Sequence, residues 1–233
     1  ENIRQFCEQQ KEIPPQVEER TSIFRNVFWV LPAICFGLSY WQYKRLFWKR
    51  DLISDLEHRF TSKTEEFPNE LVSNTEEALD YWEYRPVKFT GEFLNDYEFH
   101  IASRFHESKA GFHIVSPFKL QNTGEIIFVN RGWVPYLNKE LNSRPDSQVE
   151  GIVTLKGLVR KPSSPTSWTP QNNPLTNYWF WIDTETMSKT INKDCHNVII
   201  DLTADNYHSS SGPIPGQTRV SLPNDHLNYM ITW

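Results

Sequence analysis

The chain has 233 residues and a formal net charge of -5, and its length allows one core-bearing domain with small attachments. No nucleic-acid partner is expected, because no long basic run supplies the positive face that phosphates require. The three cysteines, Cys7, Cys35 and Cys195, lie far apart and do not indicate a disulfide framework.

The N-terminal part predicts a membrane anchor. Residues 1–21 are rich in Glu and Gln, which is atypical of a transit peptide, and we interpret them as a polar tail. Residues 27–43 carry no charge, and basic and aromatic side chains follow them, as at the end of a transmembrane helix. Apolar residues keep a helical spacing up to Phe60, so residues 22–60 are predicted to form a transmembrane helix with a soluble extension. A buried core helix containing Pro32 is the alternative.

Residues 61–223 predict a β domain, because short runs of apolar and alternating residues are separated by turn clusters. The predicted strands lie near residues 87–93, 112–115, 126–129, 153–159, 178–182 and 198–200. Strands at this spacing favour one antiparallel sheet or a small β-barrel. Short helices are expected at 75–81 and after Asp183, whose side chain can cap the second helix.

The last segment, 224–233, turns apolar and predicts the start of a second transmembrane helix, cut short at Trp233; an ordinary terminal strand is the alternative. The predicted fold class is therefore a membrane-anchored α+β protein. It has an N-terminal transmembrane helix, an antiparallel sheet or small barrel as its soluble domain, and the start of a second transmembrane helix.

The sequence carries no recognisable catalytic motif. It contains no Gly-x-Ser-x-Gly elbow, no phosphate-binding glycine loop and no cysteine in an activating context, so we predict that the protein is not an enzyme. His100, His106 and His113 lie close together in the sequence, and a zinc or copper site is one interpretation. Without a cysteine pair at ligand spacing, surface or hydrogen-bonded histidines are favoured and no metal is expected.

Two further residues have a functional and a structural interpretation. Arg131 follows a predicted strand and can contact an anion such as a propionate or a partner carboxylate. An intramolecular ion pair, or stacking of its guanidinium on an aromatic ring, is favoured instead. His226 stands at the start of the last apolar segment. It can ligate haem iron or serve as a polar interface residue, and position alone favours the second role.

Several stretches taken together resemble the Surfeit locus protein 1 family. They are residues 37–45, residues 84–87 followed by Gly91, and residues 129–135, 171–174, 212–220 and 224–233. Each stretch is modest alone, but their order and spacing are specific. The residues that carry the family signature are Trp41, Gln42, Arg45, Arg131, Gly132, Trp133, Tyr229 and Trp233.

This resemblance implies a role in early assembly of cytochrome c oxidase, around maturation of its large haem-bearing catalytic subunit. It also implies a multi-pass protein of the mitochondrial inner membrane whose soluble domain faces the intermembrane space. The charges flanking residues 27–43 would by themselves place that domain in the matrix. Haem a is the implied cofactor. It would bind transiently, with His226 as the candidate ligand of its iron.

We therefore expect a scaffold that holds the large oxidase subunit and its assembly intermediates, with inner-membrane lipid as its other partner. The alternatives are a haem a carrier and a permanent accessory subunit of the oxidase or of a respiratory supercomplex. A further alternative is an enzyme with an unrecognised site, which a deeply buried and strongly perturbed ionisable cluster would indicate.

Overall fold

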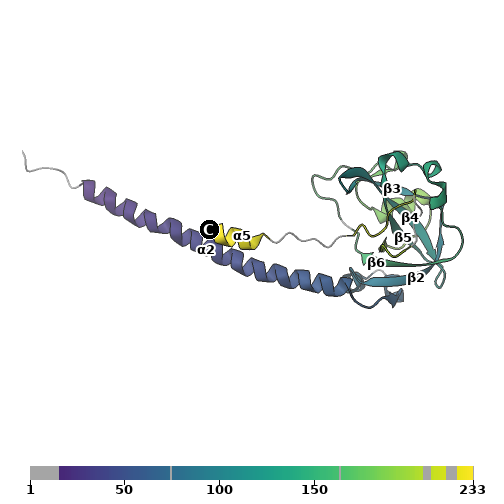
Figure 1. The fold of residues 1–233 in the computed structure, drawn as a ribbon, viewed down its shortest axis with the longest axis horizontal. Helices are drawn as coiled ribbons and strands as arrows, with labels where there is room; N and C mark the ends of the chain where they lie inside the picture. Colours follow the sequence, from purple (N-terminus) through teal and green to yellow (C-terminus); the bar gives the residue numbers. More distant parts are fainter. Residues whose placement is uncertain (1–15, 74, 163, 207–210, 219–224, 233) are drawn as a thin grey trace, which may run out of the picture. The chain divides into compact units, whose positions relative to one another are not determined.

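The computed structural model describes residues 16–232 apart from residues 74, 163, 207–210 and 219–224 (Figure 1). The chain divides into two compact units. The first comprises residues 1–54 and 222–233, and the second comprises residues 55–221.

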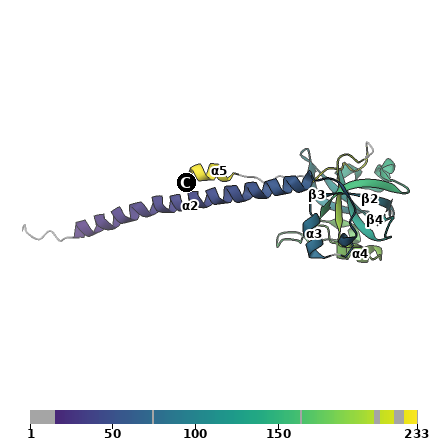
Figure 2. The same cartoon turned by 90° about the horizontal axis from the view of Figure 1, so that it is seen from below.

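Two helices make up the described part of the first unit. Helix α2 spans Gln16–Phe60 and continues into the second unit, so the predicted extension to Phe60 is confirmed. Helix α5 (His226–Thr232) lies beside α2 (Figures 1 and 2). The Ser39 hydroxyl donates a hydrogen bond to the Met230 carbonyl oxygen at 3.0 Å, which ties α5 to α2.

The predicted membrane anchor is contradicted. Within residues 16–232, leaving out the gaps named above, no helix has the length and apolar character that crossing a membrane would need. The uncharged run at 27–43 is only moderately apolar, because Trp, Tyr, Gln and Ser side chains occupy many of its positions. The membrane-anchored fold class and the placement as a multi-pass protein of the mitochondrial inner membrane, with its soluble domain in the intermembrane space, are corrected accordingly.

The second unit is built mainly from strands, with short helices between them. Its strands are β1 (Glu65–Glu66), β2 (Pro86–Phe93), β3 (Phe99–His106), β4 (Lys109–Leu120), β5 (Ile126–Pro135), β6 (Val153–Arg160), β7 (Tyr178–Trp179) and β8 (Ile199–Leu202). Its α-helices after the end of α2 are α3 (Glu76–Trp82) and α4 (Thr184–Ile191). Short 3-10 turns are η1 (Asn69–Leu71), η2 (Tyr136–Asn138), η3 (Leu141–Ser143), η4 (Pro145–Ser147) and η5 (Pro174–Thr176).

The described strands form one eight-stranded sheet in the order β1-β2-β6-β8-β5-β4-β3-β7. Strand β2 also pairs with β4, so the pairings that run from β2 through β6, β8, β5 and β4 return to β2. The pairs β1–β2, β3–β7 and β5–β8 are parallel. The predicted antiparallel sheet was therefore wrong, and the sheet is mixed.

Most of the individual elements were predicted. Strands β2, β4, β5, β6 and β8 and helices α3 and α4 occur where the patterns indicate, and the carboxylate of Asp183 accepts a hydrogen bond from the Thr186 amide as the expected cap of α4. Strands β1 and β3 were missed. Strand β1 consists of two glutamates, and β3 lacks alternation because its first four residues are all buried.

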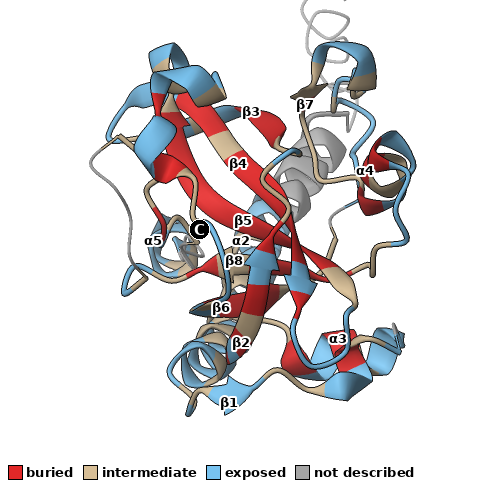
Figure 3. Ribbon diagram, turned by 90° about the vertical axis from the view of Figure 1, so that its right-hand side faces the viewer, coloured by how far each residue is buried: buried red, intermediate tan, exposed pale blue. Residues whose placement is uncertain are grey.

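Buried residues concentrate along β4 and β5, coloured red in Figure 3. One core cluster packs the apolar side of α3 onto β2, β5 and β8, through Leu79 and Trp82. A second packs α4 against β3, β5 and β7, through Met187, Ile191 and Trp179 (Figure 2 labels both helices). Each short helix thus covers its own apolar cluster, and the strands between them form the rigid platform of the domain.

Two irregularities interrupt the platform on either side of β4. Val115 and Ile114 are neighbours in β4, but they pair with Asn130 and Gly132 of β5. Arg131 of β5 is therefore an extra residue between them. In β3 the register with β4 shifts between Ile101 and Arg104. Such bulges bend a strand and change the direction of its side chains. They place the polar groups described next.

Candidate functional site

Five neighbouring strands each contribute one polar side chain to a single cleft. In sheet order these are Arg160 of β6, Asp201 of β8, Asn130 of β5, His113 of β4 and Arg104 of β3. The cavity measures about 320 Å³. We call it the polar cleft; its other lining residues are Lys161, Ile182, Ile199, Gln217 and Thr218. Polar side chains on so buried a sheet are unusual, and each one needs a partner.

A chain of hydrogen bonds fixes the orientation of the central groups. The Gly132 amide donates to Asn130 Oδ1 at 3.1 Å, which identifies that atom as the oxygen. Asn130 Nδ2 then donates to Asp201 Oδ1 at 2.9 Å and to His113 Nδ1 at 3.4 Å. His113 therefore accepts at Nδ1 and carries its proton on Nε2. The second oxygen of Asp201 accepts a hydrogen bond from the Thr218 hydroxyl at 2.6 Å.

The electrostatics of the polar cleft keep His113 uncharged. Burial, and after it the positive charge of Arg104, lower its pKa to about 4 against the opposing effect of Asp201. Burial likewise lowers the pKa of Arg104, which Asp201 opposes. Arg160 lies 3.6 Å from Asp201 and stacks on the ring of Tyr84 at 4.6 Å. The charged groups of the polar cleft are thus three cations and one carboxylate.

Gly132 allows a second chain segment to approach this part of the sheet. Its φ is +122°, and a Cβ at this position would lie 2.0 Å from the Ile214 carbonyl oxygen. Trp133 exchanges two backbone hydrogen bonds with Ile214, at 2.9 and 2.8 Å. This contact holds the segment that carries Gln217 and Thr218 against the cleft. Gly132 and Trp133 therefore have a structural role in forming its wall.

Arg131, the extra residue of β5, belongs to a different cluster. Its guanidinium lies 3.5 Å from Glu98, donates to the Ser147 carbonyl oxygen and stacks on the Phe93 ring at 4.8 Å. This is the intramolecular arrangement that the sequence favoured over an anion contact. Burial lowers the pKa of Arg131 to about 10, and Glu98 opposes this. Arg131 therefore remains charged at neutral pH.

Glu98 joins Arg131 to Arg144, and we call these three residues the buried ionic cluster. Arg144 is completely buried and pairs with both oxygens of Glu98. Its guanidinium also donates to the Asn138 carbonyl oxygen at 3.0 Å. Burial alone would raise the pKa of Glu98, but hydrogen bonds from His100 and Arg144 and the positive charge of both arginines outweigh it and lower that pKa.

The buried ionic cluster serves the fold. The cavity that Arg131 lines measures only about 30 Å³, which is room for one water molecule and too small for a substrate. The donors of Arg144 are directed at the backbone of the η2–η4 loop, to Asn138 and Lys139. The cluster therefore anchors this loop to β5, and the geometry does not describe a reacting centre.

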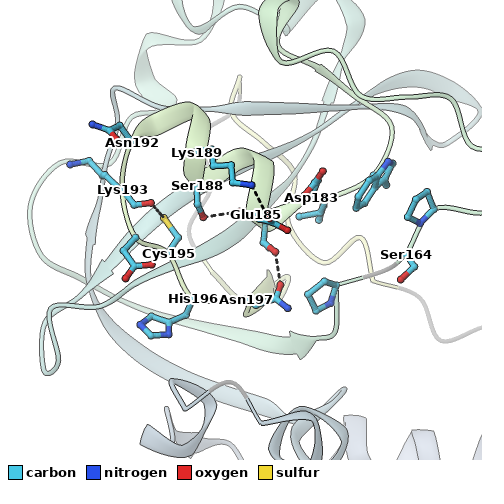
Figure 4. Close-up of a pocket in the computed structure, with 16 residues that line it drawn as sticks. Ser164, Asp183, Glu185, Ser188, Lys189, Asn192, Lys193, Cys195, His196 and Asn197 are labelled. Atoms are coloured by element: carbon cyan, nitrogen blue, oxygen red, sulfur yellow. Dashed lines mark hydrogen bonds and ion pairs between the residues drawn. The ribbon is translucent and has the colours of Figure 1, made fainter.

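A larger cavity of about 880 Å³ lies around α4 (Figure 4). Several of its charged residues already have partners, since Lys189 pairs with Glu185 at 2.5 Å and His196 pairs with Glu125. The Cys195 thiol donates to the Lys193 carbonyl oxygen at 3.7 Å, and burial raises its pKa. A thiol with a raised pKa is a poor nucleophile at neutral pH. This cavity therefore offers little chemistry of its own.

The first unit brings together the candidate haem ligand His226 and Gln42 of the family signature. His226 Nδ1 lies 2.6 Å from Gln42 Oε1, across the contact between α5 and α2. Trp41 and Tyr229 are exposed, and the Arg45 guanidinium stacks on the Trp48 ring at 3.8 Å. Trp233 lies outside the described residues.

Several residues of the polar cleft were missed from the sequence. His113 was weighed as a metal ligand, and the favoured alternative, a surface or hydrogen-bonded histidine, agrees with its contact to Asn130. Asp201, Arg104 and Arg160 were not proposed as site residues. The available signal was a charged or amide residue within or directly after an apolar strand run, as at Asn130 and Asp201. Among the residues that the structure describes, no three His, Cys, Asp or Glu side chains form a group that could hold a metal ion.

The comparisons with known proteins identify the class to which this fold and site belong. The SURF1 family model matches residues 30–233, which is most of the chain. The chain therefore belongs to the SURF1 family, and the resemblance found in the sequence is confirmed. Its function is of the SURF1 type.

Individual relatives agree with this assignment. A SURF1-like protein from Monosiga brevicollis is 38% identical over 216 residues, which cover 89% of this chain and 82% of the relative. Surfeit locus protein 1 from Mus musculus is 34% identical, with 99% of this chain and 77% of the relative covered. Surfeit locus protein 1 from Homo sapiens is also 34% identical, with 92% and 74% covered.

The approach of Ile214 to Gly132 predicts the effect of adding a methyl group. Gly132→Ala should lower the free energy of unfolding by about 3 kcal/mol or more, because the Cβ meets a backbone oxygen and φ is strained. Gly124→Ala is the matched control, since Gly124 also has a positive φ but nothing lies near its Cβ position. It should cost about 1 kcal/mol. Equal shifts of the two urea unfolding midpoints would contradict the close approach.

The low pKa of His113 predicts a pH dependence of stability. His113 takes up its second ring proton near pH 4 in the folded protein and near pH 6.5 in the unfolded chain. The stability that depends on a neutral His113 is therefore fully present above pH 6.5 and is lost as pH falls to 4. The loss amounts to about 3 kcal/mol. His113→Gln should reduce the dependence of the urea unfolding midpoint on pH between these values. His58→Gln, on the exposed end of α2, should leave that dependence unchanged. An unchanged slope in His113→Gln would show that another group titrates.

Proposed function

We propose that this chain acts in the assembly of cytochrome c oxidase, during maturation of the large haem-bearing subunit of that enzyme. Membership of the SURF1 family is the observation that supports this most directly. The proposed mode of action is to hold the large subunit and its assembly intermediates while they mature, without making or breaking bonds.

Two features of the β domain support binding over catalysis. The ionisable groups that are buried most deeply, Glu98, Arg131 and Arg144, are paired with one another and with the backbone of their own loop. The large cavity beside α4 contains a thiol whose pKa is raised. Perturbed ionisable groups suggest catalysis when they face a cavity that can hold a substrate, and the buried ionic cluster does not. In the polar cleft, the perturbed His113 already accepts from Asn130 at Nδ1, which leaves it no free nitrogen to act as a base.

Haem a is the proposed transient cofactor, with His226 as its candidate axial ligand, and a haem a carrier is the second candidate function. The contact with Gln42 favours it. The Gln42 side-chain oxygen can only accept, so His226 carries its proton on Nδ1 and keeps the lone pair of Nε2 available. A histidine that ligates a metal usually has such a partner on its other nitrogen. Haem would supply an iron centre for axial ligation.

The assembly role predicts a specific defect. Cells from which the gene is deleted should lose mature cytochrome c oxidase on native gels stained for activity and should accumulate early intermediates, while other respiratory complexes remain. Expression of the full chain should restore the oxidase. Normal oxidase levels in the deleted cells would refute the proposal. Stoichiometric recovery of the chain with active oxidase would indicate a permanent accessory subunit instead.

The ligand role of His226 predicts a loss of haem binding. The purified full chain, mixed with haem a, should retain haem and show the Soret absorption of a ligated iron. His226→Ala should abolish both, and Gln42→Ala should weaken binding about 10-fold or more, because the imidazole loses its orienting partner. His58→Ala is the control for removing a histidine elsewhere. Unchanged haem content in His226→Ala would exclude this residue as the ligand.

A further inference from the structure

The polar cleft presents positive charge and hydrogen-bond donors, while its one carboxylate is already satisfied. Asp201 accepts from Asn130 on one oxygen and from Thr218 on the other. Arg160 adds an ion pair to the same carboxylate at 3.6 Å. Asp201 is only 13% exposed, so these contacts leave it little capacity for a ligand. The remaining charged groups of the cleft are cationic.

Arg104 is the least satisfied of these cations. Its guanidinium is partly buried, and within the described part of the chain its one hydrogen bond runs to the Phe180 carbonyl oxygen at 3.5 Å. This distance is at the outer limit for such a bond. No carboxylate in the described residues lies within ion-pair distance of it. Asp201 acts on Arg104 only from beyond ion-pair distance. A partly buried guanidinium without a directly paired anion is unfavourable, and an anion in the cleft would relieve this.

Arg160, at the other end of the row of strands, also has unused capacity. Its Nε atom is buried and has no hydrogen-bond partner in the described residues. Its guanidinium is held in place by stacking on Tyr84. The neutral imidazole of His113, with its proton on Nε2, lies between the two arginines in the strand order. Two guanidinium groups and an imidazole N–H are all donors, so the complementary ligand is rich in acceptors.

We propose that the polar cleft is a binding site for a small oxyanion, a carboxylate or a phosphate, held by Arg104 and Arg160. Guanidinium groups bind the paired oxygens of either anion through parallel charge-assisted hydrogen bonds. A volume of about 320 Å³ suits a small molecule. The site is separate from the proposed haem ligand, because all of its residues belong to the β domain and His226 does not.

Calorimetry on the purified full chain tests the site. Inorganic phosphate and acetate are titrated separately, with sodium chloride holding the ionic strength constant so that general screening is the same throughout. Saturable binding of one anion per chain is expected for at least one probe. A preference for phosphate or for acetate identifies the chemical class of the ligand. Absence of saturable binding of either anion would overturn the proposal.

Substitutions locate the bound anion. Arg104→Gln and Arg160→Gln should each weaken binding about tenfold or more, because each removes a charge-assisted contact. Arg50→Gln is the matched control: it changes the net charge equally but lies on α2, outside the cleft. Circular dichroism checks that each variant is folded. Equal affinity in all four proteins would place the anion elsewhere and reject the site.

A measurement on the unaltered protein avoids any effect of substitution on folding. Phenylglyoxal modifies accessible arginines, and mass spectrometry of the peptides gives the rate for each one. A saturating concentration of the anion that binds should slow modification of Arg104 several-fold and leave Arg50 unaffected. Equal rates at Arg104 with and without the anion would contradict its role as a ligand.

Discussion

Arg131, the extra residue of β5, determines where the polar cleft and the buried ionic cluster lie in the β domain. Without a bulge, Asn130 and Gly132 would keep a regular register with β4. With it, Asn130 reaches Asp201 and His113, while Arg131 reaches Glu98. The positive φ of Gly132 then admits the Ile214 backbone, which brings Gln217 and Thr218 to the cleft. One local backbone feature thus connects a binding cleft, a buried ionic cluster and a distant segment of the chain.

The buried ionic cluster and the polar cleft differ in whether each buried charge has a partner of opposite charge. In the buried ionic cluster, Glu98 and the two arginines satisfy one another, and removing one member of such a group typically costs about 3–5 kcal/mol because a charge is left unpaired. In the polar cleft, Asp201 is satisfied but Arg104 is not. The first arrangement is what a structural anchor requires. The second is typical of a site whose complement comes from outside the chain.

Sequence patterns were sufficient where a single periodic signal decided the structure. The alternation in β2 and β6 and the cap at Asp183 were read correctly because each depends on neighbouring residues alone. The parallel pairing of β5 with β8 could not be read in this way, because it depends on contacts between residues about 70 positions apart. The prediction of a membrane helix at 27–43 was wrong for a different reason. It rested on the lack of charge and on the basic and aromatic residues at one end, although the side chains of the run are only moderately apolar.

The candidate site was partly accessible from sequence. The stretch 129–135 was singled out for its resemblance to the family, but only the structure shows that Asn130 and Arg131 belong to different clusters. Arg104 and Arg160 gave no signal, because a charged residue near the end of a strand is ordinary in any sheet. Their common placement follows from the strand order β6-β8-β5-β4-β3, which is a property of the whole fold.

The sheet margins restrict how this domain can meet another protein. The outer edge of β2 is shared between β1 and β4, and the edge of β3 carries β7 and then irregular backbone at Ser103, where φ is 58°. An interrupted or covered edge is a poor template for an added strand. Association through backbone ladders is therefore disfavoured at the described strands. A partner would have to recognise side chains on the faces and loops, so its choice depends on surface chemistry, which single substitutions can alter without disturbing the sheet.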